Sequence, residues 1–291
     1  MKQRINVSFT FTSKEKLQPN SPVVKKLITA EPDNLQTYIL KIWTYRSLIM
    51  TLAKRDLKAK YAQTGLGMIW TILQPITGLA IYTLFFQVIL NLKTEQPYIL
   101  FVLTGLICWN LFVNIFTQGS TSLMNAQELI RKLYFPKIIL PFSKVITALV
   151  ELTISAILLI AFLIAYKIPI GVAIVLAPIV ILFVILLSLG LALIVSSLTV
   201  KNRDLHHIVP YLITFGIWFT PVFYPVTIIP EQYTKFLFLN PLAGLVQLFR
   251  TCILSESVIS YAGLSLIVSF AIFSIGFLMF KRMEYDIADN I

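Results

Sequence analysis

Few residues in this sequence are of the kinds that perform catalysis or bind metal ions. The sequence has no zinc-ligand spacing, no HExxH motif, no nucleophile elbow and no phosphate-binding GxxxxGK(S/T) loop. His206 and His207 are adjacent, so their rings point to different sides of a helix, and a solvated loop is expected there rather than a metal site. Cys108 and Cys252 lie in apolar runs and are expected to be small buried side chains. We assign no catalytic residue and no metal ligand, and we expect no cofactor to bind this chain.

Two ionisable residues stand inside apolar runs, where such groups usually have a function. Glu151 is near the middle of a long run, and we expect it to hydrogen-bond to a neighbouring helix. Arg250 is in a shorter run. Its guanidinium either meets an anionic substrate or extends outward to water, and the sequence leaves both interpretations open.

Aromatic residues recur at helical spacing in several apolar runs. Carbohydrate rings stack their C–H faces on aromatic faces, so these residues are candidates for lining a channel that passes a sugar chain. The alternative, that they fill the core of a helix bundle or lie at a membrane interface, stays open. The candidate lining residues are Tyr82, Phe86, Trp109, Phe112, Phe116, Tyr211, Phe215 and Trp218.

The composition is that of a membrane protein. Of the 291 residues, 57% are hydrophobic and 13% are charged, and the mean hydropathy is +0.83. Soluble chains average about 45–50% apolar and about 25% charged residues. A secreted enzyme and a chain with a large soluble catalytic domain are excluded. Because a helical span needs about 20 apolar residues, we predict an all-α integral membrane protein with six transmembrane helices. The predicted spans are Leu66–Leu90, Tyr98–Phe116, Ile138–Ala165, Ile170–Leu198, Ile208–Val226 and Val258–Phe280.

The predicted transmembrane domain covers residues 65–281, with a cytosolic N-terminal extension (1–35) before it and a cytosolic tail (282–291) after it. Residues 36–64 have the pattern of an amphipathic helix lying along the membrane interface; packing against another protein is the alternative. We expect an ion pair between Asp56 and Lys60. The predicted apolar face of this helix is Tyr38, Ile42, Tyr45, Ile49, Leu52 and Ala53, and the polar face is Thr44, Ser47, Thr51, Lys54, Arg55 and Lys58.

Residues 226–256 are too apolar for a loop in water, yet Pro230 and the pair Asn240-Pro241 interrupt them too often for a span. We predict a re-entrant segment of two half-helices, Glu231–Leu239 and Leu242–Leu254, on the outer side; an extracellular helical cap is the alternative.

The basic residues give the orientation. Placing both termini in the cytosol puts 20 of the 24 lysines and arginines inside, in keeping with the positive-inside rule. Because the charge is gathered in loops beside apolar runs, the net charge of +11 does not indicate a nucleic-acid partner. The inner loop at 128–143 is short, basic and aromatic, which suits docking into a groove of another protein; positive-inside topology alone is the alternative.

Five segments in order and spacing resemble the permease subunits of type-two ABC exporters. They are Lys54–Pro75, Arg131–Pro141, Lys201–Asp204, Thr220–Pro225 and Leu239–Ala243, with the tail around Ala288-Asp289. More narrowly, they resemble the subfamily that exports polysaccharides and polyol phosphates, such as O antigen, capsule and wall teichoic acid. The resemblance covers about residues 36–291.

The resemblance implies a homodimer in the cytoplasmic (inner) membrane, paired with two separately encoded ATPase subunits that hold ATP and magnesium. It implies a lipid-linked polysaccharide substrate, with O antigen preferred. Teichoic acid, capsule or small lipophilic drugs are alternatives, as are a non-transporting scaffold and a membrane-embedded glycan-modifying enzyme. Within residues 126–141 it implies a coupling helix for the ATPase, with Arg131, Lys132, Tyr134, Phe135 and Pro136 as contact residues. It also implies an outer gate that includes Asn240, Pro241 and Arg250.

Overall fold

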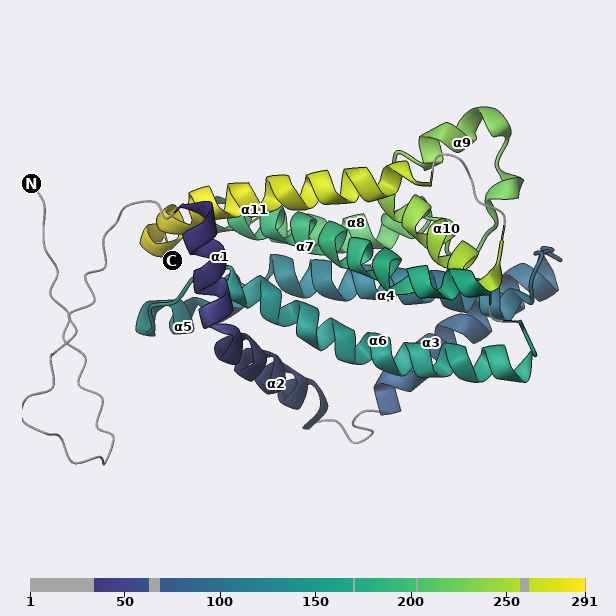
Figure 1. Cartoon of the computed structure of the whole chain (residues 1–291), viewed down its shortest axis with the longest axis horizontal. Helices are drawn as coiled ribbons and strands as arrows, with labels where there is room; N and C mark the ends of the chain where they lie inside the picture. The colour runs from purple at the N-terminus through teal and green to yellow at the C-terminus, as the bar shows by residue number, and fades with distance from the viewer. Residues whose placement is uncertain (1–33, 63–68, 170, 203, 257–261, 291) are drawn as a thin grey trace, which may run out of the picture.

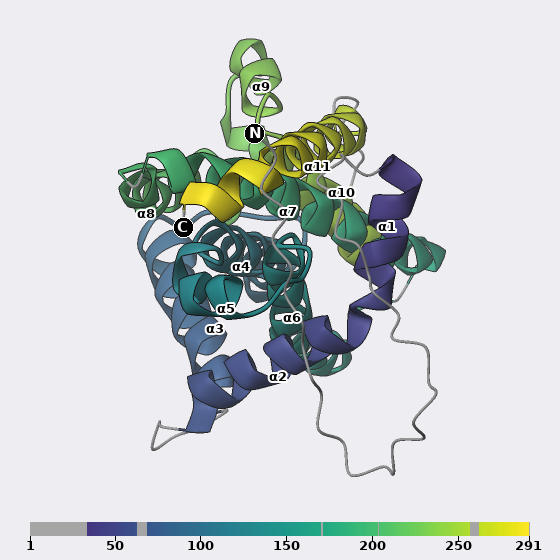
Figure 2. The same ribbon diagram turned by 90° about the vertical axis from the view of Figure 1, so that its left-hand side faces the viewer.

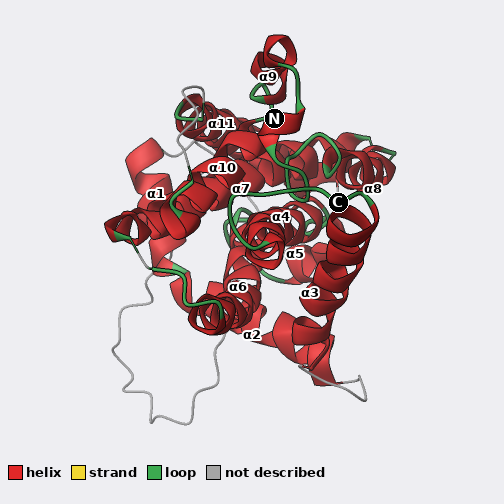
Figure 3. Cartoon of the chain, turned by 90° about the vertical axis from the view of Figure 1, so that its right-hand side faces the viewer, coloured by secondary structure: helices red, strands yellow, loops and turns green. Residues whose placement is uncertain are grey.

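The computed structural model describes residues 34–62, 69–169, 171–202, 204–256 and 262–290. All regular elements within these ranges are helical, as Figure 3 shows in red. The predicted N-terminal extension lies outside the described residues, except for Asn34 and Leu35. The all-α prediction is therefore confirmed for the described part of the chain.

The helices follow the apolar runs of the sequence closely. In chain order they are α1 (Leu35–Thr44), α2 (Arg46–Ala62), α3 (Ile69–Tyr82), the π-helix η1 (Thr83–Ile89), α4 (Tyr98–Ser120), the 3₁₀ turn η2 (Met124–Ala126), α5 (Gln127–Lys132), α6 (Ile139–Ala165), η3 (Val172–Leu176), α7 (Ala177–Lys201), α8 (Leu205–Gly216), η4 (Val226–Ile228), α9 (Glu231–Leu237), α10 (Pro241–Leu254) and α11 (Leu264–Asn290).

Helix α4 is the centre of the bundle. It packs against α6, α7 and α10, and most of its residues are buried. Helix α11 lies along the other side of α7, and α2 lies obliquely against α6 (Figure 1). Helices α1 and α5 and the end of α11 gather at one end of the molecule, whereas α9 and α10 lie toward the other (Figures 1 and 2). The predicted inner and outer elements are thus separated along the long axis.

Five helical segments are long and apolar enough to cross a membrane, and they correspond to five of the six predicted spans. They are Ile72–Ile89, Tyr98–Ser120, Ile139–Ala165, Val172–Thr199 and Leu264–Glu284. The first is continuous through Pro75 and changes from α-helix to π-helix at Thr83. A π-helix of seven residues is unusual, because such segments are mostly single turns.

The remaining predicted span, Ile208–Val226, is helical only as far as Gly216 within α8, and turns follow it. Pro221 and Pro225 explain the early end, since proline lacks a backbone N–H and disfavours helical geometry in the residue before it. The prediction of one helix across this range is therefore wrong.

The predicted amphipathic helix forms two helices that meet at Tyr45. Its faces are as predicted: Tyr38, Leu52 and Ala53 are buried, and all six predicted polar-face residues are exposed. The break lets α1 contact α11 while α2 contacts α6. The predicted pair of Asp56 with Lys60 is wrong, because each finds a partner on α6 instead.

The predicted re-entrant segment, residues 226–256, contains the two expected short helices, α9 and α10. Helix α9 ends two residues earlier than expected, and α10 begins one residue earlier. The Asn240 side chain accepts from the backbone N–H of Leu242, 3.1 Å away, and so caps α10. Pro241 occupies the first turn of this helix, where its missing N–H costs no hydrogen bond.

Candidate functional site

The predicted aromatic stripes lie in two different environments. Trp109 and Phe116 on α4 are buried in the single chain, and Phe116 packs with Ala192 of α7 and Val209 of α8. Phe112 lies beside them, with its ring centroid 5.5 Å from that of Phe116. By contrast, Tyr211, Phe215 and Trp218 on or just after α8 are all exposed. Helix α8 therefore presents an uncovered aromatic face, whereas the α4 stripe supports it from behind.

Tyr82 and Phe86 join an aromatic cluster around Phe223. The ring of Phe223 stacks on Phe86 at 4.7 Å and on Tyr82 at 5.1 Å, and Trp218 meets it edge-on at 5.0 Å. The cluster joins the first span to the turn that follows α8. Sequence reasoning did not select Phe223, although it lies within the quoted segment Thr220–Pro225.

Arg250 is fully buried and bound to backbone carbonyl groups. Its Nη1 donates to the Pro221 oxygen at 2.6 Å, and its Nη2 donates to the Val222 oxygen at 2.6 Å. Nε and Nη2 also reach the Phe101 oxygen at 3.2 Å, and the guanidinium lies 3.5 Å from the centre of the Phe101 ring. Neither of the two expected roles matches this geometry, since Arg250 ties the turn after α8 to α4.

Asn240, another predicted gate residue, and Tyr98 of α4 hold the same turn. The Asn240 amide donates to the Thr220 hydroxyl at 2.9 Å and to the Phe219 carbonyl at 3.2 Å. The Tyr98 hydroxyl donates to the Phe223 carbonyl at 2.6 Å. Together with Arg250, these side chains donate to four carbonyl groups of the turn, those of Phe219, Pro221, Val222 and Phe223.

The predicted coupling residues divide into exposed and buried ones. Arg131 and Lys132 at the end of α5 are exposed, and Tyr134 is 70% exposed. Phe135 is only 5% exposed and belongs to the hydrophobic core, while Pro136 is half-buried. The accessible part of this loop therefore ends at Tyr134.

Glu284 of α11 holds this loop in place. One carboxylate oxygen accepts from the backbone N–H of Lys137, and the other accepts from the hydroxyl of Tyr38 on α1. The Lys137 ammonium also donates to the Glu284 carbonyl at 3.2 Å. One side chain thus connects α1, the inner loop and the last span.

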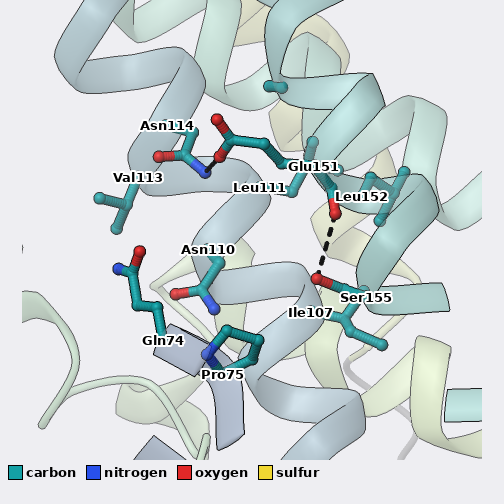
Figure 4. Close-up of a pocket in the computed structure, with 11 residues that line it drawn as sticks. Gln74, Pro75, Ile107, Asn110, Leu111, Val113, Asn114, Glu151, Leu152 and Ser155 are labelled. Carbon is teal, nitrogen blue, oxygen red and sulfur yellow. Dashed lines mark hydrogen bonds between the residues drawn. The ribbon is translucent and has the colours of Figure 1, made fainter. Parts of the chain in front are cut away.

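A polar pocket lies between α3, α4 and α6 (Figure 4). Two of its lining residues, Asn110 and Glu151, stand near the middle of α4 and α6. The carboxylate of Glu151 accepts from the Asn114 amide at 2.6 Å, from the Tyr61 hydroxyl at 3.3 Å and from Lys60, with which it forms an ion pair. The expected bond between Glu151 and neighbouring helices is confirmed. Gln74 and Asn110 also line the pocket. Sequence reasoning missed these amides, although side-chain amides inside apolar runs are a usable signal.

Comparison with known proteins identifies related sequences across most of the chain. The profile of the family described as "ABC-2 type transporter" matches residues 47–254. The chain is 30% identical over 262 residues to the O-antigen export system permease protein RfbA of Myxococcus xanthus, covering 87% of this chain and 98% of that one. It is 26% identical to an RfbA of Klebsiella pneumoniae, covering 83% and 94%. It is 24% identical to the polysialic acid transport protein KpsM of Escherichia coli, covering 81% and 93%.

Proposed function

Because the chain belongs to the ABC-2 type transporter family, we propose that it is the permease subunit of an exporter that moves lipid-linked O antigen across the cytoplasmic membrane. The observation that carries this proposal is the near full-length similarity to three permeases named for O-antigen export. The apolar helix bundle suits a pathway through lipid. The more distant similarity to a polysialic acid transport protein favours capsule polysaccharide as the second candidate substrate.

The proposed assembly is a homodimer with two copies of a separate ATPase subunit, which binds ATP and magnesium. In the proposed assembly the second copy packs against the uncovered aromatic face of α8 and the exposed apolar side chains of α3 and η1, and the other exposed apolar side chains face lipid. The chain then crosses the inner membrane six times with both termini in the cytosol. The sugar chain of the substrate passes along the aromatic residues of α8 and the cluster around Phe223.

ATP-driven movement reaches the permease through the inner loop in this proposal. An ATPase subunit docks on the exposed side chains of Arg131, Lys132 and Tyr134. Displacement of the loop is passed to α1 and α11, because Glu284 binds the backbone of Lys137 and the hydroxyl of Tyr38. The spans move together as one body, since the side chains between them are closely packed.

A pair of single substitutions separates docking from stability in the inner loop. Tyr134→Ala removes an exposed contact, so we expect normal folding with ATP hydrolysis no longer stimulated by substrate and export reduced at least tenfold. Phe135→Ala empties a core position, so we expect about 3–5 kcal/mol lower stability. Export assays and thermal melting of the purified complex measure the two effects. Undiminished export by Tyr134→Ala contradicts the docking role.

The test of the function itself is complementation. Deleting the gene should remove the surface glycan and leave lipid-linked glycan inside the cell, and the wild-type chain should restore export. Purification in mild detergent should recover an ATPase subunit in equal amount. Changed drug sensitivity with normal surface glycan would instead indicate small lipophilic substrates. Loss of capsule with intact O antigen would favour the second candidate.

A further inference from the structure

The pocket between α3, α4 and α6 has features of a ligand site that the transport pathway described above does not use. It runs from the exposed side chain of Gln74 to the carboxylate of Glu151, which is only 8% exposed. Ile107, Leu111 and Leu152 form apolar walls. Figure 4 shows Gln74 and Asn110 projecting from neighbouring helices toward the same space, beside the Asn114–Glu151 bond.

Two of the polar groups lack protein partners. Within the described residues, the side-chain amides of Gln74 and Asn110 make no hydrogen bond. Each amide has two donor hydrogens and an acceptor oxygen. Asn110 is partly buried between apolar walls, where its amide needs water or a ligand with both donors and acceptors, and the exposed amide of Gln74 is accessible to the same ligand.

The charge of the pocket selects a neutral ligand. Glu151 is the one carboxylate lining it, and the Lys60 ammonium already pairs with that carboxylate. No unpaired cation among the described lining residues would attract a phosphate. Hydroxyl groups both donate and accept, so they match amides together with a carboxylate that retains accepting capacity. A polyol fits these requirements better than a lipid phosphate does.

The position of the pocket fits the entry of a substrate anchored in lipid. Lys60 and Tyr61 lie at the end of α2, the predicted interfacial helix, and both donate to Glu151. Glu151 is seven residues beyond Lys144 on α6, about 10 Å deeper along that helix. The cavity volume is about 50 Å³, which admits a few water molecules or one edge of a sugar ring, not a whole ring.

We propose that Gln74, Asn110, Asn114 and Glu151 bind vicinal hydroxyl groups on one edge of a sugar, in the saccharide part of the lipid-linked substrate next to its anchor. The assignment rests on the proposed export function and adds an entry site to it. The sugar edge displaces water from Gln74 and Asn110 and accepts from or donates to their amides. Its ring stays at the mouth of the pocket, beside the exposed part of α3.

The test uses the full complex of permease and ATPase in liposomes, with lipid-linked glycan extracted from the producing strain as the probe. The readout is the glycan concentration that gives half-maximal stimulation of ATP hydrolysis. We expect Asn110→Leu and Gln74→Leu each to raise it about three- to tenfold, the usual effect of one lost hydrogen bond. Asn110→Gln keeps the amide and should recover most of the affinity. Thr153→Val, exposed on α6 outside the pocket, should leave it unchanged.

A cross-linking measurement covers the case in which a leucine variant fails to fold. A photoreactive phenylalanine analogue at the exposed position Gln74 should form an adduct carrying glycan, whereas the same analogue at Ile157, on the exposed side of α6, should not. Adducts with phospholipid alone would overturn the proposal, as would unchanged half-maximal concentrations in both leucine variants. If the wild-type chain fails to restore export in the deletion strain, the export function is wrong, and the saccharide assignment falls with it.

Discussion

At the scale of single residues, Arg250 has the most demanding environment in the described chain, because its charge is fully buried in a bundle that lies in lipid. Burying an ion is costly unless its hydrogen-bonding groups are satisfied. The carbonyl groups of Phe101, Pro221 and Val222 meet this requirement. In return, the guanidinium gives donors to the carbonyl groups of Pro221 and Val222, which lie in a turn and have no helical partner.

Replacing Arg250 tests this reciprocal role. Arg250→Met leaves the carbonyl groups of Pro221 and Val222 without a donor, at about 1–3 kcal/mol each, so the melting temperature of the purified protein should fall sharply. Arg250→Lys keeps the charge, but a single ammonium cannot reproduce the planar fork, and it should recover only part of the loss. Lys93→Met on the exposed outer loop is the control. Wild-type stability in Arg250→Lys would contradict the clamp.

Gly105 makes the approach of Arg250 possible. A Cβ atom at this position would lie 2.7 Å from Nη2 of Arg250 and 2.6 Å from the Val222 oxygen. Sequence patterns could not have revealed this, because the two helices and the turn meet only in three dimensions. The expected roles for Arg250, substrate contact or extension to water, both treated the side chain alone. Its actual partners are backbone atoms 28 to 149 residues away.

At the scale of helices, the length and periodicity of the apolar runs predicted where several helices lie and which of their faces are buried. The bounds of α4, α6 and α10 and the faces of α1 and α2 follow from run length and from 3.6-residue periodicity. The early end of α8 follows from Pro221 and Pro225, which a count of apolar residues overlooks. The break at Tyr45 brings α1 and α2 against different helices, which periodicity does not contain. The same holds for the pocket: the amides of Asn110 and Asn114 could be read from the sequence, but their convergence with Gln74 could not.

The crossing of α7 and α11 depends on two glycines. A Cβ atom on Gly190 would lie 2.6 Å from the Cα of Phe273, and one on Gly276 would collide with the backbone of Gly190. We expect Gly276→Ala to force the helices apart and to lower stability by about 1–3 kcal/mol. Gly263→Ala is the matched control, since nothing lies within 4 Å of its Cβ position. Thermal melting in detergent measures both, and equal melting temperatures would contradict the close crossing.

The ion pair between Asp56 and Lys144 joins α2 to α6, and its contribution to stability depends on pH. Burial alone would raise the pKa of Asp56, but hydrogen bonds from Lys144 and Arg55 and their positive charges lower it below its ordinary value of 3.8. The pair therefore stabilises the fold above pH 3.8, and this contribution is lost as the pH falls through the lower folded-state pKa.

Removing the carboxylate of Asp56 checks this dependence. Asp56→Asn should be less stable than wild type at pH 7, by about 1–3 kcal/mol, because Lys144 is only 13% exposed and loses its partner. Wild type should lose this advantage on acidification below pH 3.8, and the two melting temperatures should converge. A constant difference from pH 7 to pH 3 would mean that Asp56 acts through packing and not through its charge.

At the scale of the whole molecule, the end with α1 and α5, which is the inner end in the proposed orientation, differs in its construction from the end with α9 and α10, the proposed outer end. At the inner end, one carboxylate, Glu284, joins three elements and leaves the loop residue Tyr134 exposed. At the outer end, a turn without helical hydrogen bonds is enclosed by Arg250, Asn240 and an aromatic cluster. The inner end is therefore suited to receive a partner. The outer end is suited to hold irregular backbone away from lipid.

Enclosure of that turn bears on how many times the chain crosses the membrane. Helix α8 has 12 residues and extends about 18 Å, short of the roughly 30 Å of a hydrocarbon core. Non-helical backbone survives at membrane depth only where it is buried and hydrogen-bonded. The carbonyl groups of Phe219, Pro221, Val222 and Phe223 all accept from side chains, so the turn can complete the crossing that α8 begins.

We therefore expect Asn202 and Gln232 to face opposite sides of the membrane. In a chain with Cys108 and Cys252 replaced by alanine, a membrane-impermeant maleimide applied to spheroplasts should label Gln232→Cys at once and Asn202→Cys only after permeabilisation. Lys167→Cys and Lys132→Cys, both exposed, serve as outer and inner references. If Asn202→Cys and Gln232→Cys react from the same side, α8 enters and leaves by one face. The chain then crosses five times, and its C-terminal tail lies outside, where it could not meet a cytosolic ATPase.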